Sequence, residues 1–184
     1  MSDTVNDQFR EEQLSEMLRI AFRHWNEVRG DRVMPERREI DPLELRRTLT
    51  RTWLYEREDD MTYRCRLAGE EINSAYGRPI QSRLARDVIG PKFDAVVRLR
   101  WDYALDRGAV YHGFSKSSAV GPTIERLCVP LADSDGTPRF VFGVSQYFDS
   151  AAPKLDQNSF NFISLDVNFY EIPTFQRLFE DVPA

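Results

Sequence analysis

Three strand-like segments follow one another in the second half of the chain, separated only by short connections. They span residues 109–116, 124–132 and 139–148. In the middle segment Leu127, Val129 and Leu131 fall on alternate positions, the period of two that is typical of a β-strand. The dipeptide Asp135-Gly136 predicts a tight hairpin before the third segment. Consecutive strands joined in this way pair antiparallel, so the chain must contain an antiparallel meander.

Two further strands are predicted earlier, at residues 50–56 and 62–68. Between them and the meander lie short helical segments and one long helix, which begins at Pro91 and ends before Gly108. Two strands, a helical excursion and three strands predict an α+β fold: one five-stranded antiparallel sheet with helices on one face.

Both flanks of this core carry further elements. Residues 8–29 read as one amphipathic helix, whose apolar stripe must cover the other face of the sheet or pair with a second copy. Asp41-Pro42 predicts a short helix to about residue 49. At the other end we expect a strand at 160–170 and a short helix that begins at Pro173. The expected division is therefore a helical flank (1–49), a core (50–148) and a C-terminal extension (149–184).

Composition excludes several classes of protein. The 184 residues carry a net charge of −5, whereas nucleic-acid-binding domains are usually basic. No stretch approaches the roughly 18–20 apolar residues of a membrane span, and the polar N-terminus does not resemble a signal peptide. A cytoplasmic protein is expected. The two cysteines and two histidines lie far apart, which argues against a zinc site, and common catalytic motifs are absent.

Arginine is over-represented among the basic residues. All but three of the 25 lysines and arginines are arginine. Codon bias accounts for the total, but a planar guanidinium also suits carboxylates and other anions. Because several arginines stand close in sequence to Asp41, Glu70 and Glu71, we expect a number of structural ion pairs, with Arg66 the most informative to mutate.

Several short motifs carry a resemblance to a known family. They are Trp25 with Ile40-Asp41-Pro42, Arg66-Leu67-Ala68-Gly69 with Tyr76-Gly77-Arg78, and Val129-Pro130-Leu131 with Asp135-Gly136. In this order, over roughly residues 20–148, the chain resembles the single-domain PAS proteins common in alphaproteobacteria. The resemblance implies a stand-alone sensory or regulatory module. Such a module binds a small molecule or a partner protein, signals through another chain, and dimerises through its flanking helix.

The PAS resemblance also implies a small, mostly apolar cavity between the sheet and its helices. The candidate lining residues are Trp53, Arg66, Tyr76, Trp101, His112 and Phe114. Each also has a purely structural interpretation: Trp101 as core, His112 as a hydrogen-bonded histidine, and Arg66 as the partner of Glu70 or Glu71. The sequence does not identify a cofactor, because neither haem at His112 nor a flavin-reactive cysteine has a supporting motif.

Two other functions remain open at this stage. One is a ligand-free scaffold protein with the same core. The other is a small acid–base enzyme with His112 or a buried carboxylate as its base, which would need that histidine in an open pocket beside a carboxylate.

Overall fold

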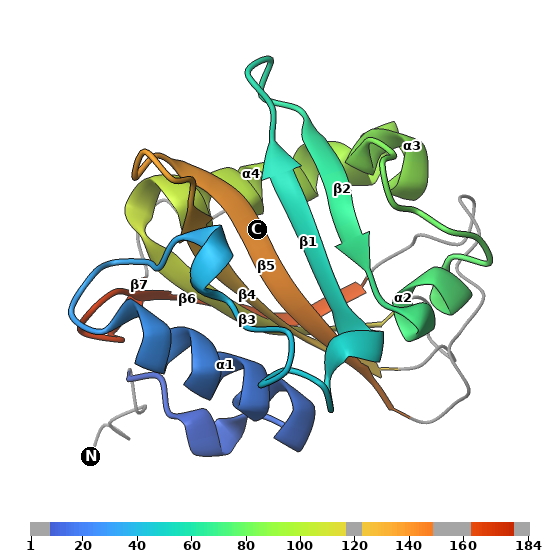
Figure 1. Ribbon diagram of the computed structural model, residues 1–184. Coiled ribbons are helices and arrows are strands. Elements are labelled where there is room, and N and C mark those ends of the chain that lie inside the picture. The colour runs from blue at the N-terminus through green and yellow to red at the C-terminus, as the bar shows by residue number, and fades with distance from the viewer. Residues whose placement is uncertain (1–7, 117–122, 149–162, 179–184) are drawn as a thin grey trace.

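The computed structural model describes residues 8–116, 123–148 and 163–178, and is built around one antiparallel sheet of seven strands (Figure 1). The order across the sheet is β2-β1-β5-β4-β3-β6-β7, and every neighbouring pair is antiparallel. The strands are β1 (Thr52–Arg57), β2 (Tyr63–Ala68), β3 (Ala109–Lys116), β4 (Thr123–Ala132), β5 (Pro138–Tyr147), β6 (Ile163–Glu171) and β7 (Arg177–Leu178). The five expected strands are therefore confirmed, and β6 and β7 extend the sheet beyond β3.

Helices cover both faces of this sheet. The α-helices are α1 (Glu16–Arg29), α2 (Glu70–Ala75), α3 (Ala85–Ile89) and α4 (Pro91–Arg107), and the short 3-10 helices are η1 (Glu11–Gln13), η2 (Arg37–Glu39) and η3 (Leu49–Arg51). Helices α2, α3 and α4 lie on one side of the sheet and α1 lies across the other (Figure 1). Helix α4 ends as predicted at Gly108, which adopts the left-handed conformation with φ of 61°.

Because both faces are covered, each strand contributes to two separate cores. In β5, Phe140, Phe142 and Val144 pack on the α1 side, whereas Val141 packs on the side of α2–α4. The alternation follows from the period of two in a β-strand, which sends neighbouring side chains to opposite faces. Consequently nearly every residue in the middle of these strands is buried.

The apolar stripe of α1 packs on the sheet of its own chain. Leu18, Ala21, Phe22 and Trp25 are buried against β4 and β5. The indole Nε1 of Trp25 donates a hydrogen bond of 3.0 Å to the carbonyl oxygen of Pro130, which fixes the helix on β4. The stripe is thus occupied within one chain, so it no longer supports the expected homodimer through this helix.

Local signals gave the wrong structure at both flanks. The expected single helix at 8–29 is interrupted at Leu14, and only its second part is α-helical. Residues 42–48 form turns instead of a helix. The Asp41 Oδ1 atom does accept a hydrogen bond of 2.8 Å from the Leu43 amide, as an N-cap would, but the backbone continues with bonds between residues three apart, Arg46 to Leu43 and Thr48 to Leu45.

The expected helix beginning at Pro173 is also absent over the described residues 173–178. A turn leads there into β7, which pairs with β6, and residues 179–181 of the expected helix lie outside the described part. Phe175 explains this outcome. Its ring packs against Phe9 and Phe22, and its carbonyl accepts a hydrogen bond of 2.8 Å from the Phe9 amide. These tertiary contacts outweigh a local preference for helix.

Candidate ligand-binding cavity

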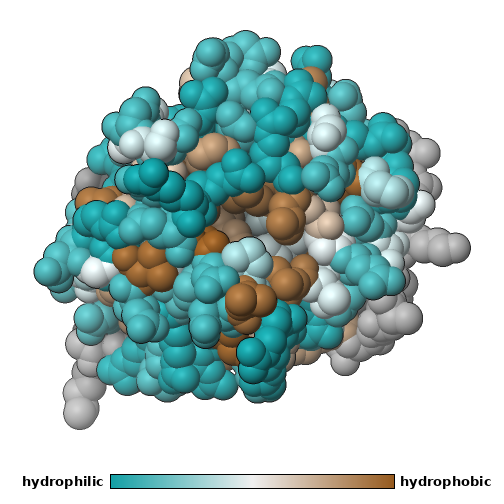
Figure 2. All heavy atoms as spheres, in the orientation of Figure 1, coloured by the Kyte–Doolittle hydropathy of each residue, from teal (hydrophilic) through white to brown (hydrophobic). Residues whose placement is uncertain are grey.

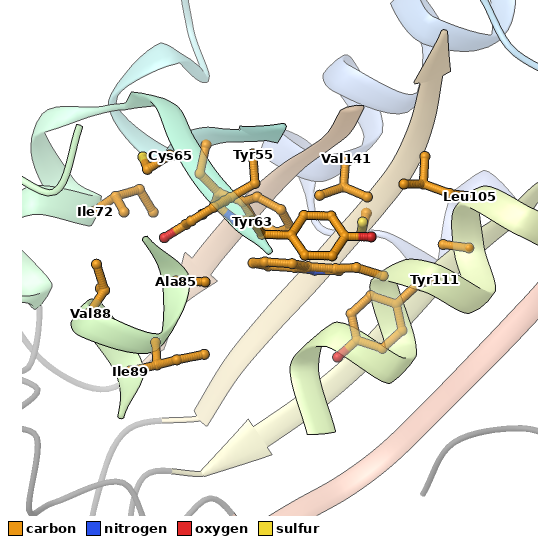
Figure 3. Packing of buried hydrophobic residues seen from close by; sticks show 14 of the residues in the cluster. Tyr55, Tyr63, Cys65, Ile72, Ala85, Val88, Ile89, Leu105, Tyr111 and Val141 are labelled. Atoms are coloured by element: carbon orange, nitrogen blue, oxygen red, sulfur yellow. The ribbon is translucent and has the colours of Figure 1, made fainter. Parts of the chain in front are cut away.

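A cavity of about 330 Å³ lies between the sheet and helices α2–α4. That volume is at the lower end of the range for small-molecule sites, about 300–1,000 Å³. Strands β1, β3, β4 and β5 form its floor, and α2, α3 and α4 form its walls. Figure 3 shows the core around it, where Tyr55, Tyr63 and Tyr111 lie between the strands and the helices.

One wall of the cavity is aromatic. The Trp101 ring lies 4.7 Å from the Tyr55 ring and 5.7 Å from the Trp53 ring, measured between centroids. The Trp53 Nε1 atom donates a hydrogen bond of 3.0 Å to the Ser145 Oγ atom. Gly143 permits this position, because a Cβ atom there would lie 2.1 Å from the Trp53 Cζ2 atom. A glycine in the centre of β5 is therefore required for the indole to lie flat on the sheet.

Another part of the lining is polar and positively charged. Arg100 on α4 and Arg126 on β4 both line the cavity, beside Tyr111 and Ser115 of β3. The guanidinium of Arg126 donates a hydrogen bond to the Ser115 Oγ atom. Burial raises the pKa of Tyr111, and the positive charges of Arg126 and Arg100 act in the opposite direction.

The two remaining tyrosines of the cavity experience the same positive charge. Burial raises the pKa of Tyr76 and of Tyr147, and in each case the charge of Arg126 opposes that shift. At neutral pH Tyr76, Tyr111 and Tyr147 therefore keep their protons.

Three of the residues expected from the sequence line this cavity: Trp53, Tyr76 and Trp101. Arg66 lies elsewhere, on the outward face of β2. Its Nε atom is 2.6 Å from the Glu56 Oε2 atom, so the expected ion pair exists, but with Glu56 in place of Glu70 or Glu71. Cross-strand pairing of β1 with β2 brings Glu56 to Arg66, a contact that closeness in sequence does not indicate.

His112 and Phe114 lie on the α1 side of the sheet and do not line the cavity. They share that face with Val110, whereas Tyr111 and Ser115 face the cavity. The expectation chose the wrong set of alternate residues, because both faces of β3 are buried and the pattern of hydrophobicity does not distinguish them. Tyr111 and Ser115 of β3 and Arg126 of β4 were missed for the same reason, because both strands are buried on both faces. For Arg100 the available signal was its spacing of three and four residues from Val97 and Val96, which line the cavity from the same helix.

His112 forms a buried pair with Glu125 of β4, with 2.9 Å between Nε2 and Oε1. Burial alone would raise the pKa of Glu125, but hydrogen bonds from His112 and from the Ser15 amide outweigh it and lower that pKa. The histidine has a carboxylate within reach, yet it is 6 % exposed and packs beneath Phe9. This arrangement lacks the open pocket that an acid–base enzyme needs.

The remaining reactive side chains offer little nucleophilic or metal chemistry. Cys65 and Cys128 are both buried and unpaired as disulfides, and burial raises the pKa of Cys65 to about 11. Over residues 8–116, 123–148 and 163–178 there is no cluster of three or more potential metal ligands. Nor does that part of the chain contain a helix long and apolar enough to cross a membrane.

The sheet order, the helices α2–α4 and the cavity between them together define an α+β domain. A family model described as a PAS domain matches residues 14–146, which is most of the chain. The chain therefore belongs to the PAS-domain family. No curated protein and no solved structure gives a significant match. The matched range begins just before α1 and ends in β5, so β6 and β7 lie beyond it.

Proposed function

We propose that the protein is a sensory or regulatory module that binds a small molecule in the cavity between the sheet and α2–α4. The single observation that carries the proposal is the cavity itself. It has the volume of a ligand site, and its aromatic and aliphatic walls are interrupted by a few polar groups. Membership of the PAS-domain family supports a sensory role over a catalytic one.

Strand β4 offers a route from the cavity to the N-terminal segment. The neighbouring residues Glu125 and Arg126 point to opposite faces of the sheet. Arg126 lines the cavity, and the Glu125 Oε1 atom accepts a hydrogen bond of 3.3 Å from the Ser15 amide at the start of α1. If β4 has two positions and a ligand binds more tightly to one of them, the ligand shifts the equilibrium toward that position. It thereby changes the fraction of molecules in which α1 is docked on the sheet. A second protein chain would bind differently to the docked and undocked states of α1.

The α1 side also presents an apolar surface on which such a chain could act. A groove lined by Leu45, Leu49, Leu54, Leu67 and Phe142 lies beside α1. Figure 2 shows hydrophobic residues gathered around the middle of this face. Leu67 is exposed, whereas Leu45, Leu54 and Phe142 are buried, so the groove offers a partner chain a small apolar contact.

Native mass spectrometry tests ligand binding directly. The protein is incubated with a small-molecule extract of the cells that produce it, alongside the variant Val97→Phe, which adds volume inside the cavity. The matched control is Leu99→Phe on the same helix, because Leu99 is exposed. We expect an added mass on the wild type and on Leu99→Phe, and none on Val97→Phe. Ligand-free masses for all three proteins would favour the scaffold alternative and overturn the proposal.

Hydrogen exchange tests the proposed output. If the cavity communicates with α1, adding the captured molecule changes the exchange of amides in residues 15–29 of the wild type. The same addition has no effect on Val97→Phe. Exchange that changes only in α2–α4 would retain the binding function and exclude the route through β4.

A further inference from the structure

Both arginines of the cavity already have hydroxyl partners within the protein. Arg126 of β4 donates a hydrogen bond to the Ser115 Oγ atom, and Arg100 of α4 is hydrogen-bonded to the Tyr111 side chain. The two guanidinium groups therefore require no anion to satisfy them. A charged ligand would lose its hydration on entering a lining that is mostly apolar, at a large cost in free energy. The lining thus favours an uncharged ligand.

The polar atoms on the aromatic side of the cavity are paired as well. The Trp53 Nε1 atom donates a hydrogen bond of 3.0 Å to the Ser145 Oγ atom, and the Tyr55 hydroxyl group is hydrogen-bonded to the Cys65 sulfur atom. A ligand with many polar atoms would have to break such bonds or remain unsatisfied beside them, and either outcome is unfavourable. The ligand must therefore be mostly apolar.

Aromatic side chains make up much of the lining. They account for seven of the sixteen described lining residues, a larger share than the five aliphatic ones. The planes of the Trp53 and Tyr55 rings are each inclined by 36° to the plane of the Trp101 ring. Aromatic rings attract one another in offset and inclined arrangements of this kind. A ring of the ligand can join this cluster and gain contacts that an alkyl chain does not make.

The aliphatic part of the lining is stiff. In the described part of the chain it consists only of isoleucine and valine: Ile72, Ile80, Ile89, Val96 and Val97. Their β-branched side chains have few rotamers, so the shape of the cavity is largely fixed before a ligand enters. A rigid molecule enters such a cavity with little loss of freedom, whereas a flexible chain must give up the rotation of its bonds.

The volume of the cavity limits the size of the ligand. An apolar cavity of about 150 Å³ is large enough to bind benzene. The cavity beside α4 measures about 330 Å³, roughly twice as much. A ligand with about two fused rings would therefore fill it.

We propose that the cavity binds an uncharged, flat aromatic molecule of about two fused rings, packed among the aromatic side chains of the lining. This inference rests on the proposed function, because it names the class of ligand for the same cavity. It does not depend on which protein chain responds to the bound state.

Three probes test the charge and the shape of the ligand: 2-naphthol, 2-naphthoate and 1-decanol. The two alcohols have the same number of heavy atoms, whereas 2-naphthoate keeps the fused rings and adds a negative charge. Isothermal titration calorimetry at neutral pH measures each affinity. We expect 2-naphthol to bind the wild type roughly threefold to tenfold more tightly than 1-decanol. Burial of apolar area alone would give the opposite order, because the alkyl chain has the larger apolar surface.

The comparison with 2-naphthoate tests the charge separately. Since the carboxylate must be desolvated, we expect 2-naphthoate to bind at least about tenfold more weakly than 2-naphthol.

Two variants of α4 locate the rings of the ligand. Phe93→Leu replaces a half-buried ring of the lining with an aliphatic side chain. It should weaken the binding of 2-naphthol about threefold or more and leave that of 1-decanol nearly unchanged. Tyr103→Leu is the matched control, because Tyr103 packs against Phe169 and does not line the cavity. Urea unfolding of both variants verifies that they are folded.

Two results with the wild type would overturn the inference. One is 1-decanol binding as tightly as 2-naphthol, and the other is 2-naphthoate binding as tightly as 2-naphthol. Equal weakening of both alcohols by Phe93→Leu, or failure of all three probes to bind, would also reject it. In each case the mass spectrum of the wild type against Val97→Phe still decides separately whether the cavity binds a small molecule.

Discussion

The Nε2 atom of His112 lies 2.9 Å from the Oε1 atom of Glu125, across the neighbouring strands β3 and β4 and beneath the N-terminal segment. The same carboxylate oxygen accepts a hydrogen bond from the Ser15 amide. One buried carboxylate therefore holds the start of α1 on the sheet. It stands immediately before Arg126, which faces the cavity on the other side.

Glu125→Gln should destabilise the protein by about 1–2 kcal/mol at neutral pH, because the hydrogen bonds from Ser15 and His112 would then be made to a neutral oxygen, and bonds to an ionised group are stronger. The pKa of Glu125 is lowered in the folded protein, whereas the pKa of a glutamate in the unfolded chain is about 4.3. The stabilisation is thus fully present above that pH and is lost as the pH falls through the lower folded pKa. Urea unfolding at neutral and acidic pH measures the difference.

The control for this prediction is Glu70→Gln, at an exposed position. Its effect should stay within about 0.5 kcal/mol at every pH. A deficit of Glu125→Gln that is equally large at pH 7 and below the folded pKa would show that packing, and not the charge, is responsible.

Gly143→Ala should damage the cavity through sterics. The added Cβ atom would overlap the Trp53 indole, so we expect a cost of about 1–3 kcal/mol and an altered tryptophan emission spectrum. The added mass seen for the wild type in native mass spectrometry should be reduced or absent in this variant. The comparison is Ser145→Ala, which removes the acceptor of the Trp53 N–H without adding volume and should cost about 1 kcal/mol. Unchanged emission in Gly143→Ala would contradict the observed position of the indole.

Strong local patterns allowed the core of the fold to be predicted from the sequence. Helix α4 begins at Pro91 and stops at Gly108, and strand β3 follows at once, all as expected. These boundaries depend on residues that act within a few positions of themselves: proline at the first helical turn and glycine in the left-handed conformation. Alternation within β4 was equally direct, because Leu127, Val129 and Leu131 share one face.

Two features that depend on packing between distant segments could not be predicted in the same way: which face of β3 lines the cavity, and which surface α1 covers. A strand that is buried on both faces has no polar side, so nothing in 109–116 indicates whether Tyr111 or His112 faces the cavity. Similarly, an amphipathic helix shows that its stripe is buried but not against what, and α1 proved to cover its own sheet. Of the candidate site, sequence alone located three of the aromatic residues, Trp53, Tyr76 and Trp101, and missed Tyr111 and the two arginines.

Tyr63→Phe should cost about 2 kcal/mol, because the buried hydroxyl donates a hydrogen bond of 2.7 Å to the Asp102 Oδ1 atom of α4. This bond joins β2 to the helix that carries the cavity wall. Asp106→Asn provides the contrast. Asp106 is largely exposed, so loss of its ion pair with Arg57 should cost less than about 1 kcal/mol. Equal losses in urea unfolding would show that the tyrosine contributes no more than a surface contact.

Arg66→Gln should leave ligand binding unchanged. The Arg66 side chain pairs with Glu56 on the face of β2 that points away from the cavity, and Glu56 also lies 2.9 Å from Arg139. Since the arginine is about one-third exposed and its carboxylate keeps a second partner, the loss should stay below about 1 kcal/mol. A double-mutant cycle with Glu56→Gln measures the coupling, and native mass spectrometry with the small-molecule extract measures binding. Loss of the added mass in Arg66→Gln, with normal stability, would place this arginine in the binding function after all.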